Sequence, residues 1–183
     1  DVVDADLSKY FDTIPHSELM RCVARRIVDR MILSLIKMWL KAPVEERDRD
    51  GTRRMTGGKA SKHGTPQGGV ISPILANVYL HYALDMWFQK VVIPHCRGQA
   101  YLIRFADDFV CLFEFEEDAR RFYEVLGKRL SKFGLELSAE KTQIIPFSAK
   151  ALGREASSFD FLGFEFRWGK DRKGKPHVDK RTA

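Results

Sequence analysis

Residues 100–115 read AYLIRFADDFVCLFEF. Runs rich in β-branched and aromatic residues lie on both sides of Asp107 and Asp108, so the stretch predicts two strands joined by a tight turn. Adjacent carboxylates inside an apolar run cost free energy if they are buried without partners. A plain turn would explain an isolated pair, because aspartate is common in turns. Residues elsewhere in the chain must decide between a plain turn and a functional site.

The segments around this hairpin alternate between strand and helix patterns. Residues 1–7 predict a buried strand, and residues 116–133 predict an amphipathic helix that leads to another strand. Before the hairpin we expect a helix capped by Ser17, a helix over 30–41, and a helix that starts at Ser72-Pro73 and runs to Phe88. The order is β–α–β–β–α–β, the split βαβ pattern, in which the first strand lies beside the central hairpin. The expected fold class is therefore α+β, a ferredoxin-like antiparallel sheet with helices on one face.

Three further segments carry local expectations. The helix at 30–41 should turn four apolar side chains inward: Ile32, Leu35, Ile36 and Trp39. Residues 159–168, followed by the basic segment GKDRKGK and by PHV, predict a C-terminal hairpin with a basic turn. The polar, glycine-rich segment at 43–64 predicts a loop or a flexible hairpin, either solvated or in contact with a phosphate backbone.

A second group of acids lies at the start of the chain, where residues 4–12 read DADLSKYFD. Alternate residues of a strand share a face, so we expect Asp4 and Asp6 on one face. If this strand pairs beside the hairpin, Asp6 converges with Asp107 and Asp108. Carboxylates that close repel one another unless cations lie among them. Oxygen ligands favour Mg²⁺ or Mn²⁺, and two such ions about 4 Å apart can activate a hydroxyl and stabilise a leaving phosphate oxygen.

Composition narrows the classes of function. The chain has 183 residues, enough for one domain with a real core, and its net charge of +6 is compatible with a polyanionic partner. Three cysteines without a CxxC pair and five scattered histidines argue against a zinc site and for reduced thiols in a cytoplasmic protein. No apolar run reaches ~18 residues and no signal peptide is visible, so no membrane partner is expected.

Five segments in order resemble the motifs of reverse transcriptases, most closely the group II intron-encoded type and its bacterial relatives. They are DADLSKYFDTIPH at 4–16, HGTPQGGVISPILANVYLH at 63–81, RFADDF at 104–109, LSAEKT at 137–142 and FLGFEF at 161–166. The resemblance covers essentially the whole chain. It implies a polymerase palm over 1–168, with a basic loop insertion at about 43–64. Residues 169–183 would then begin the connection to a missing thumb, and the fingers would be missing upstream.

The resemblance assigns the catalytic acids by position. Asp6 and Asp107 would hold two Mg²⁺ ions, for which Mn²⁺ can substitute. Asp108 would be an auxiliary ligand, and the backbone carbonyl of Leu7 would complete one metal site. Asp4 precedes the matched position by two residues, and we expect it to tune the site or to pair with a base.

The resemblance also implies a nucleotide pocket. Phe11 would clash with a ribose 2′-hydroxyl and so select dNTPs over NTPs, and the alternative for it is a core aromatic. Gln67 and Gly68 would line the pocket and contact the templating base. Lys141 would protonate or neutralise the departing pyrophosphate, and the alternative is a solvated surface lysine.

Further residues are expected along the primer and the template. Phe161, Leu162 and Gly163 would support the primer 3′ end, although an ordinary core strand would have the same pattern. Phe105 stands before the acids where the intron family more often has Tyr. The candidate contacts to the nucleic-acid backbone, each of which could instead be a solvated charge, are Arg53, Arg54, Lys59, Lys62 and the basic turn at 167–175.

The function implied is RNA-directed DNA synthesis, in which a primer 3′-hydroxyl attacks a dNTP on an RNA template. The implied partners are the RNA template, the DNA primer, dNTP and intron RNA, and apolar faces left by missing domains would favour a homodimer. The isolated fragment can be inactive if it needs those domains. One alternative is a non-catalytic RNA-binding or splicing (maturase) fragment, which would not need repelling acids. Another is a palm-type nucleotide cyclase, which would need neither TPQGG nor Phe11.

Overall fold

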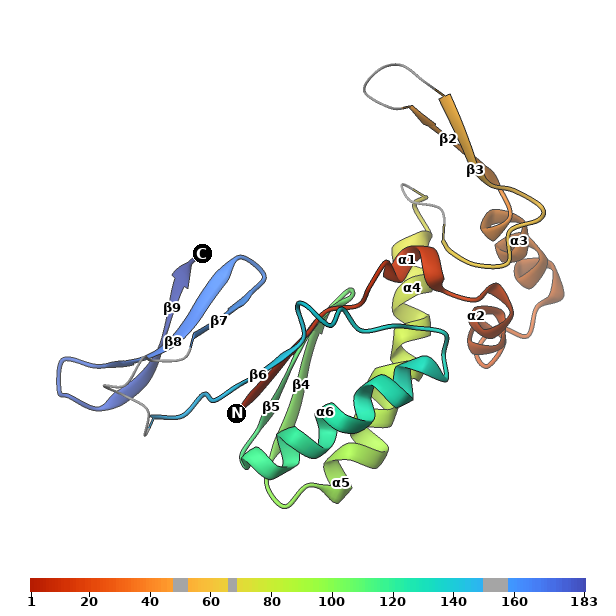
Figure 1. The fold of residues 1–183 in the computed structure, drawn as a ribbon. Coiled ribbons are helices and arrows are strands. Elements are labelled where there is room, and N and C mark those ends of the chain that lie inside the picture. Colours follow the sequence, from red (N-terminus) through yellow and green to blue (C-terminus); the bar gives the residue numbers. More distant parts are fainter. Residues whose placement is uncertain (48–52, 66–68, 150–157) are drawn as a thin grey trace. The chain divides into compact units, whose positions relative to one another are not determined.

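The computed structural model describes residues 1–47, 53–65, 69–149 and 158–183 of the chain (Figure 1). The chain forms two compact units, each with its own buried side chains. The sheet unit comprises Asp1–Leu7, Trp87–Arg129 and Leu137–Ala183, and the helix unit comprises Ser8–Met86 and Leu130–Glu136. No helix within the described ranges combines the length and the apolar character that crossing a membrane requires.

The sheet unit contains a four-stranded antiparallel sheet in the order β4-β5-β1-β6. Its strands are β1 (Val2–Ala5), β4 (Ala100–Phe105), β5 (Asp108–Phe113) and β6 (Gln143–Ile145). β1 lies between β5 and β6 and pairs with both. The prediction that the first strand lies beside the central hairpin is therefore confirmed, and the chain is α+β with antiparallel sheets.

Helix α6 (Glu116–Ser131) lies along one face of this sheet (Figure 1). The sequence predicts one apolar stripe for this helix, formed by Ala119, Phe122, Leu126, Leu130 and Phe133. The first four are buried, and Phe133 is half-buried beyond the end of the helix. The ring of Phe122 packs against Phe113 of β5, with ring centroids 5.2 Å apart. Since alternate strand residues point to opposite faces, the odd-numbered residues of β5 face α6 and the even-numbered ones face away from it. Two short helical segments of the same unit, the π-helical η2 (Phe88–Val92) and α5 (Ile93–His95), precede β4.

The opposite face of the sheet packs against a second, three-stranded sheet in the order β7-β8-β9. Its strands are β7 (Ser158–Phe161), β8 (Phe164–Lys170) and β9 (Pro176–Thr182). Phe159 of β7 shares a buried cluster with Val2, Val110 and Ile145. The predicted C-terminal hairpin is therefore only part of this sheet. The segment at 159–168 is two strands, because the chain reverses at Leu162 and Gly163, whose φ angles are 53° and 77°.

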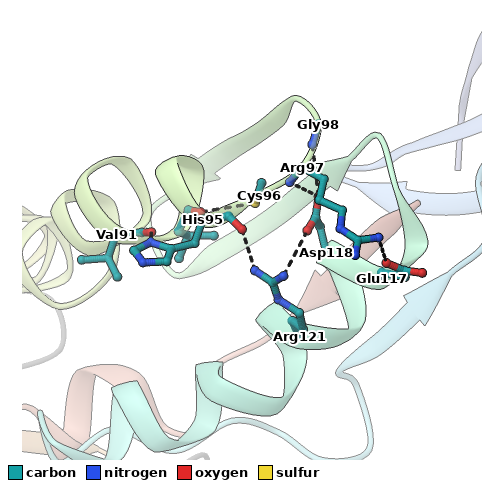
Figure 2. A network of polar contacts seen from close by, with 9 residues as sticks. Val91, His95, Cys96, Arg97, Gly98, Glu117, Asp118 and Arg121 are labelled. Atoms are coloured by element: carbon teal, nitrogen blue, oxygen red, sulfur yellow. Dashed lines mark hydrogen bonds and ion pairs between the residues drawn. The ribbon is translucent and has the colours of Figure 1, made fainter.

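The loop that enters β4 is tied to the first turn of α6 by polar contacts (Figure 2). Asp118 is 2% exposed and accepts hydrogen bonds from the backbone N–H groups of Arg97 (2.8 Å) and Gly98 (3.3 Å). The guanidinium of Arg121 lies 3.9 Å from the other Asp118 carboxylate oxygen and donates to the carbonyl of His95. This buried acid thus holds the start of β4 against α6.

The helix unit contains short helices and one hairpin. They are α1 (Tyr10–Thr13), α2 (His16–Val23), α3 (Arg30–Leu40), β2 (Pro43–Arg47), β3 (Arg53–Gly57), α4 (Ser72–Leu80) and the π-helical η1 (His81–Asp85). β2 and β3 pair as an antiparallel hairpin, one of the two forms expected for the segment at 43–64. The helix expected to start at Ser72-Pro73 does begin at Ser72, with Ile71 rather than Ser72 as its N-cap residue. Helical backbone continues past the expected end at Phe88, through η2 and α5, to His95.

Two local predictions in the helix unit are wrong. Helix α2 begins at His16 rather than after a Ser17 cap, because the Leu19 N–H donates to the Pro15 carbonyl at 2.9 Å and so brings His16 and Ser17 into the first turn. In α3, only Ile36 of the four expected inward side chains is buried, together with Leu40. The other three, Ile32, Leu35 and Trp39, are exposed. The buried stripe of this helix is therefore narrower than the apolar pattern of its sequence.

Candidate functional site

The register of the sheet brings the two groups of acids together. Ala106 (φ 55°) and Asp107 form the turn between β4 and β5, and Asp108 is the first residue of β5, opposite Phe105. β1 pairs antiparallel with β5 through Ala5 and Phe109, so continuing that register by one residue sets Asp6 opposite Asp108. The sheet therefore places the acid after β1 next to the acids at the hairpin turn.

Asp108 and Asp4 show the electrostatic consequence of this convergence. Desolvation raises the pKa of the Asp108 carboxyl, and the nearby charges of Asp107 and Asp6 raise it further, while Lys141 lowers it. Desolvation also raises the pKa of the Asp4 carboxyl. A hydrogen bond with Gln143 lowers this pKa and so offsets part of the rise. The charges of Asp6 and Asp108 add to the rise at Asp4. These carboxylates therefore repel one another, as the sequence predicted.

Lys141 lies against the acids. Its Nζ is 3.0 Å from Oδ2 of Asp6, with the lysine side chain 72% exposed and the aspartate side chain 25% exposed. The hydrogen bond and the charge of Asp6 raise the pKa of the Lys141 ammonium. This ion pair was not expected from the sequence. Its only signal is the position of LSAEKT just before β6, the strand that pairs with β1.

The neighbours of Asp4 were also missed. Gln143 lies opposite Asp4 in the β1–β6 pair, and Asp160 of β7 is near enough for its charge to act on Asp4. Leu7, expected to offer a metal ligand through its carbonyl, is buried, and its backbone forms an isolated bridge with Leu137. Strand pairing, which the sequence gives only approximately, would have been needed to find Gln143.

The helix unit holds the residues expected at the nucleotide. Phe11 is partly exposed on α1, and its ring meets the buried Tyr10 edge to face at 5.4 Å. The core aromatic of this pair is Tyr10, whose hydroxyl donates to the Ala76 carbonyl at 2.6 Å. The Thr65 N–H donates to the Phe11 carbonyl at 2.7 Å. Gln67 and Gly68 lie outside the described residues.

The residues expected along the primer differ in exposure. Phe105, just before the turn, is 65% exposed. Phe161 packs partly against the cluster around Phe159, while Leu162 is exposed at the turn beside Gly163. Phe161 thus contributes to the core, which leaves Leu162 and Gly163 at the surface.

The expected backbone contacts lie on two hairpins, except Lys59 and Lys62, which are exposed in the segment after β3. Arg53 of β3 pairs with Glu45 of β2 at 3.3 Å, which offsets part of its charge, and Arg54 follows it on β3. The basic turn between β8 and β9 is ordered by Asp171, whose Oδ1 accepts from the N–H groups of Lys173 and Lys175 at 2.8 Å each.

The donor chemistry at the acids fits a hard cation. Carboxylate oxygens gather at the end of β1 and at the β4–β5 turn, and oxygen is the donor that Mg²⁺ and Mn²⁺ prefer. Within the described residues, no three His, Cys, Asp or Glu side chains are already arranged around one metal position. Besides these carboxylates, the Lys141 ammonium lies at this position, paired with Asp6.

One family model and one known protein match most of this chain, and a further protein matches less than half of it. A family model described as "Reverse transcriptase (RNA-dependent DNA polymerase)" matches residues 2–166. Protein YkfC of Escherichia coli (strain K12) is 32% identical over 205 residues, which cover 97% of this chain and 49% of YkfC. Group II intron-encoded protein LtrA of Lactococcus lactis subsp. cremoris is 37% identical over 79 residues, 43% of this chain and 12% of LtrA.

A solved structure shows the same fold at low sequence identity. Telomerase from Candida albicans in complex with the TWJ fragment of telomeric RNA has a TM-score of 0.63 and 16% identity. The match covers 91% of this chain and 29% of the telomerase chain. The chain therefore spans about half the length of YkfC and less than a third of that telomerase.

Proposed function

This chain belongs to the reverse transcriptase (RNA-dependent DNA polymerase) family, and on that premise we propose that it carries the catalytic centre of an RNA-directed DNA polymerase. The observation that carries the proposal is the β1–β5 register, which sets Asp6 beside Asp107 and Asp108. The strand order β4-β5-β1-β6 is that of a split βαβ sheet and supports a ferredoxin-like palm over 1–168.

The proposed chemistry follows from the acids. Two Mg²⁺ ions, when bound, would favour ionisation of the primer 3′-hydroxyl and stabilise the leaving oxygen of pyrophosphate. Asp6 and Asp107 would hold these ions, with Asp108 as an auxiliary ligand and the Leu7 carbonyl completing one site. The side chains themselves contribute positioning, because the paired strands fix the acids before any substrate arrives.

Residues of both units would select and hold the substrates. The partly exposed ring of Phe11 would exclude a ribose 2′-hydroxyl, and Lys141 would neutralise the departing pyrophosphate. Leu162, Gly163 and Phe105 would contact the primer end. RNA as the template is supported by two similar proteins, a group II intron-encoded protein and a telomerase solved in complex with RNA.

The test is primer extension by the protein that contains this chain, on matched RNA and DNA templates with Mg²⁺. We expect DNA synthesis on RNA, and its loss by at least about a hundredfold in Asp107→Asn, because a carboxylate that places charge at the reacting atoms is removed. Glu124→Gln is the matched control, since Glu124 is an exposed acid on α6 and its loss should leave synthesis unchanged.

The outcomes separate the candidate functions. Synthesis that survives in Asp107→Asn would refute the assignment of the acids. A wild-type protein that binds RNA tightly but extends no primer would favour the RNA-binding or splicing alternative. Equal extension with NTPs and dNTPs would remove sugar selection from the proposal and return Phe11 to a packing role.

A further inference from the structure

Lys141 sits on a turn whose backbone is anchored to the acid that it pairs with. The N–H of Ser138 donates to the Asp6 carbonyl at 2.8 Å, and Leu137 forms the bridge with Leu7. The N–H groups of Lys141 and Thr142 both donate to the Ser138 carbonyl, which closes the turn. The backbone of this turn is therefore held to the end of β1, and the Lys141 ammonium reaches Asp6 without a change in the strands.

The side chain of Lys141, by contrast, is free to leave. It is 72% exposed, and its four-carbon stem has several rotatable bonds. An exposed ion pair of this kind contributes little net stability, so a divalent ion with several carboxylates to bind can displace it. The anchored backbone keeps the Lys141 ammonium near Asp6, and its exposure to solvent makes the ion pair between them weak.

We propose that Lys141 is a built-in counterion of Asp6 that a divalent metal ion must displace, so that metal binding and release of the lysine are one coupled step. In the metal-free protein the ammonium offsets part of the repulsion among Asp6, Asp107 and Asp108. When a metal ion takes Asp6, the ammonium is freed beside the same acids, where an anionic triphosphate would attract it. The inference rests on the proposed function, because it assigns a divalent ion to these acids.

The coupling predicts a measurable competition. Removing the ammonium should tighten metal binding by the strength of the lost ion pair, which corresponds to about two- to fivefold in the dissociation constant. The direction of this change in metal affinity identifies the role of Lys141. Loss of a counterion tightens metal binding, whereas loss of a metal ligand would weaken it. Without metal, the same variant should melt about 1–3 °C lower, since the acids lose their counterion.

The experiment is titration of Mn²⁺ into the full protein, with free Mn²⁺ followed by electron paramagnetic resonance. The variants are Lys141→Gln, Lys141→Arg, Asp6→Asn and Lys128→Gln, the last as the matched control on α6, where Lys128 is exposed. We expect tighter binding in Lys141→Gln, wild-type binding in Lys141→Arg and Lys128→Gln, and weaker binding in Asp6→Asn.

The outcomes distinguish the inference from the function on which it rests. Unchanged or weaker Mn²⁺ binding in Lys141→Gln, with weaker binding in Asp6→Asn, would overturn the counterion role and leave the metal site standing. Equal tightening in Lys141→Gln and Lys128→Gln would also overturn it, because only general charge would be at work. A wild-type protein that binds Mn²⁺ no better than Asp6→Asn would overturn both.

Discussion

Two groups of aspartates in the sheet unit meet opposite conditions. Asp118 is buried at the start of α6 and receives two backbone N–H donors and the guanidinium of Arg121 (Figure 2). Asp107 and Asp108 lie at the exposed β4–β5 turn with Asp6 close by, where the neighbouring charges are mostly other carboxylates. The fold stabilises the carboxylate of Asp118. The same fold holds Asp6, Asp107 and Asp108 close together although their charges repel one another.

The difference indicates what each group is for. A buried carboxylate that accepts backbone hydrogen bonds through one oxygen and faces a guanidinium with the other, as Asp118 does, helps to fix the structure around it. Carboxylates that a fold forces together cost free energy unless a cation joins them. Acids of the second kind are candidates for chemistry, and acids of the first kind are part of the architecture. Substitutions in the two groups should therefore change different properties.

The largest effect on stability should come from Asp118. Asp118→Ala removes the acceptor of the Arg97 and Gly98 N–H groups and leaves Arg121 without its buried partner. We expect a loss of about 2–3 kcal/mol in the free energy of unfolding, measured by urea denaturation. A loss below about 0.5 kcal/mol would show that this network does not hold the loop, and the contrast between the two groups would fail.

An intermediate effect, on the choice between NTP and dNTP, should come from Phe11. Phe11 and its neighbour Tyr10 differ in the same way as the two groups of aspartates, since one residue is structural and the other is available to a substrate. Tyr10 is buried and hydrogen-bonded, whereas Phe11 is partly exposed. Phe11→Ala should raise NTP incorporation relative to dNTP by about tenfold, because a steric barrier of ordinary size is removed. Single-nucleotide incorporation with each sugar measures the ratio, with Phe115→Ala as an exposed aromatic control in the sheet unit. An unchanged ratio would place Phe11 with Tyr10 as a packing residue.

The smallest effect should come from Asp108. Asp108→Asn removes one member of a repelling group, so the metal-free protein should keep its stability or gain by less than about 1 kcal/mol at neutral pH. The sign follows from the raised pKa of Asp108, which means that its ionised form is disfavoured in the folded protein. Urea denaturation in the presence of a chelator checks it. A loss of stability like that of Asp118→Ala would mean that Asp108 has a structural partner.

Much of the sheet could be predicted from the sequence. The apolar runs on both sides of Asp107 required a hairpin, and the stripe from Ala119 to Leu130 required a helix above it. The split βαβ order then predicted β1 beside β5, which is enough to bring Asp6 to the turn. These features follow from the spacing of apolar residues within each segment, which can be counted directly along the sequence.

Most of the remaining features depend on contacts that periodicity does not encode. The phenylalanines of FDFLGFEF lie at 159, 161, 164 and 166, so their alternation shifts by one residue at Leu162 and Gly163. This shift marks the turn, and reading the segment as one strand overlooked it. The apolar pattern of α3 predicts a stripe but does not say how much of it is covered. The pairing of Lys141 with Asp6 needs the bridge between Leu7 and Leu137, which joins residues far apart in the chain.

The most direct test of the contrast is the melting temperature with and without Mg²⁺ for the wild type, Asp107→Asn and Asp118→Asn. Saturating Mg²⁺ should raise the wild-type melting temperature by about 5 °C, because a ligand that binds only the folded state stabilises it. Asp118→Asn should melt lower but show the same shift, and Asp107→Asn should show little or none. An equal shift in Asp107→Asn and the wild type would contradict the assignment of these acids to a cation.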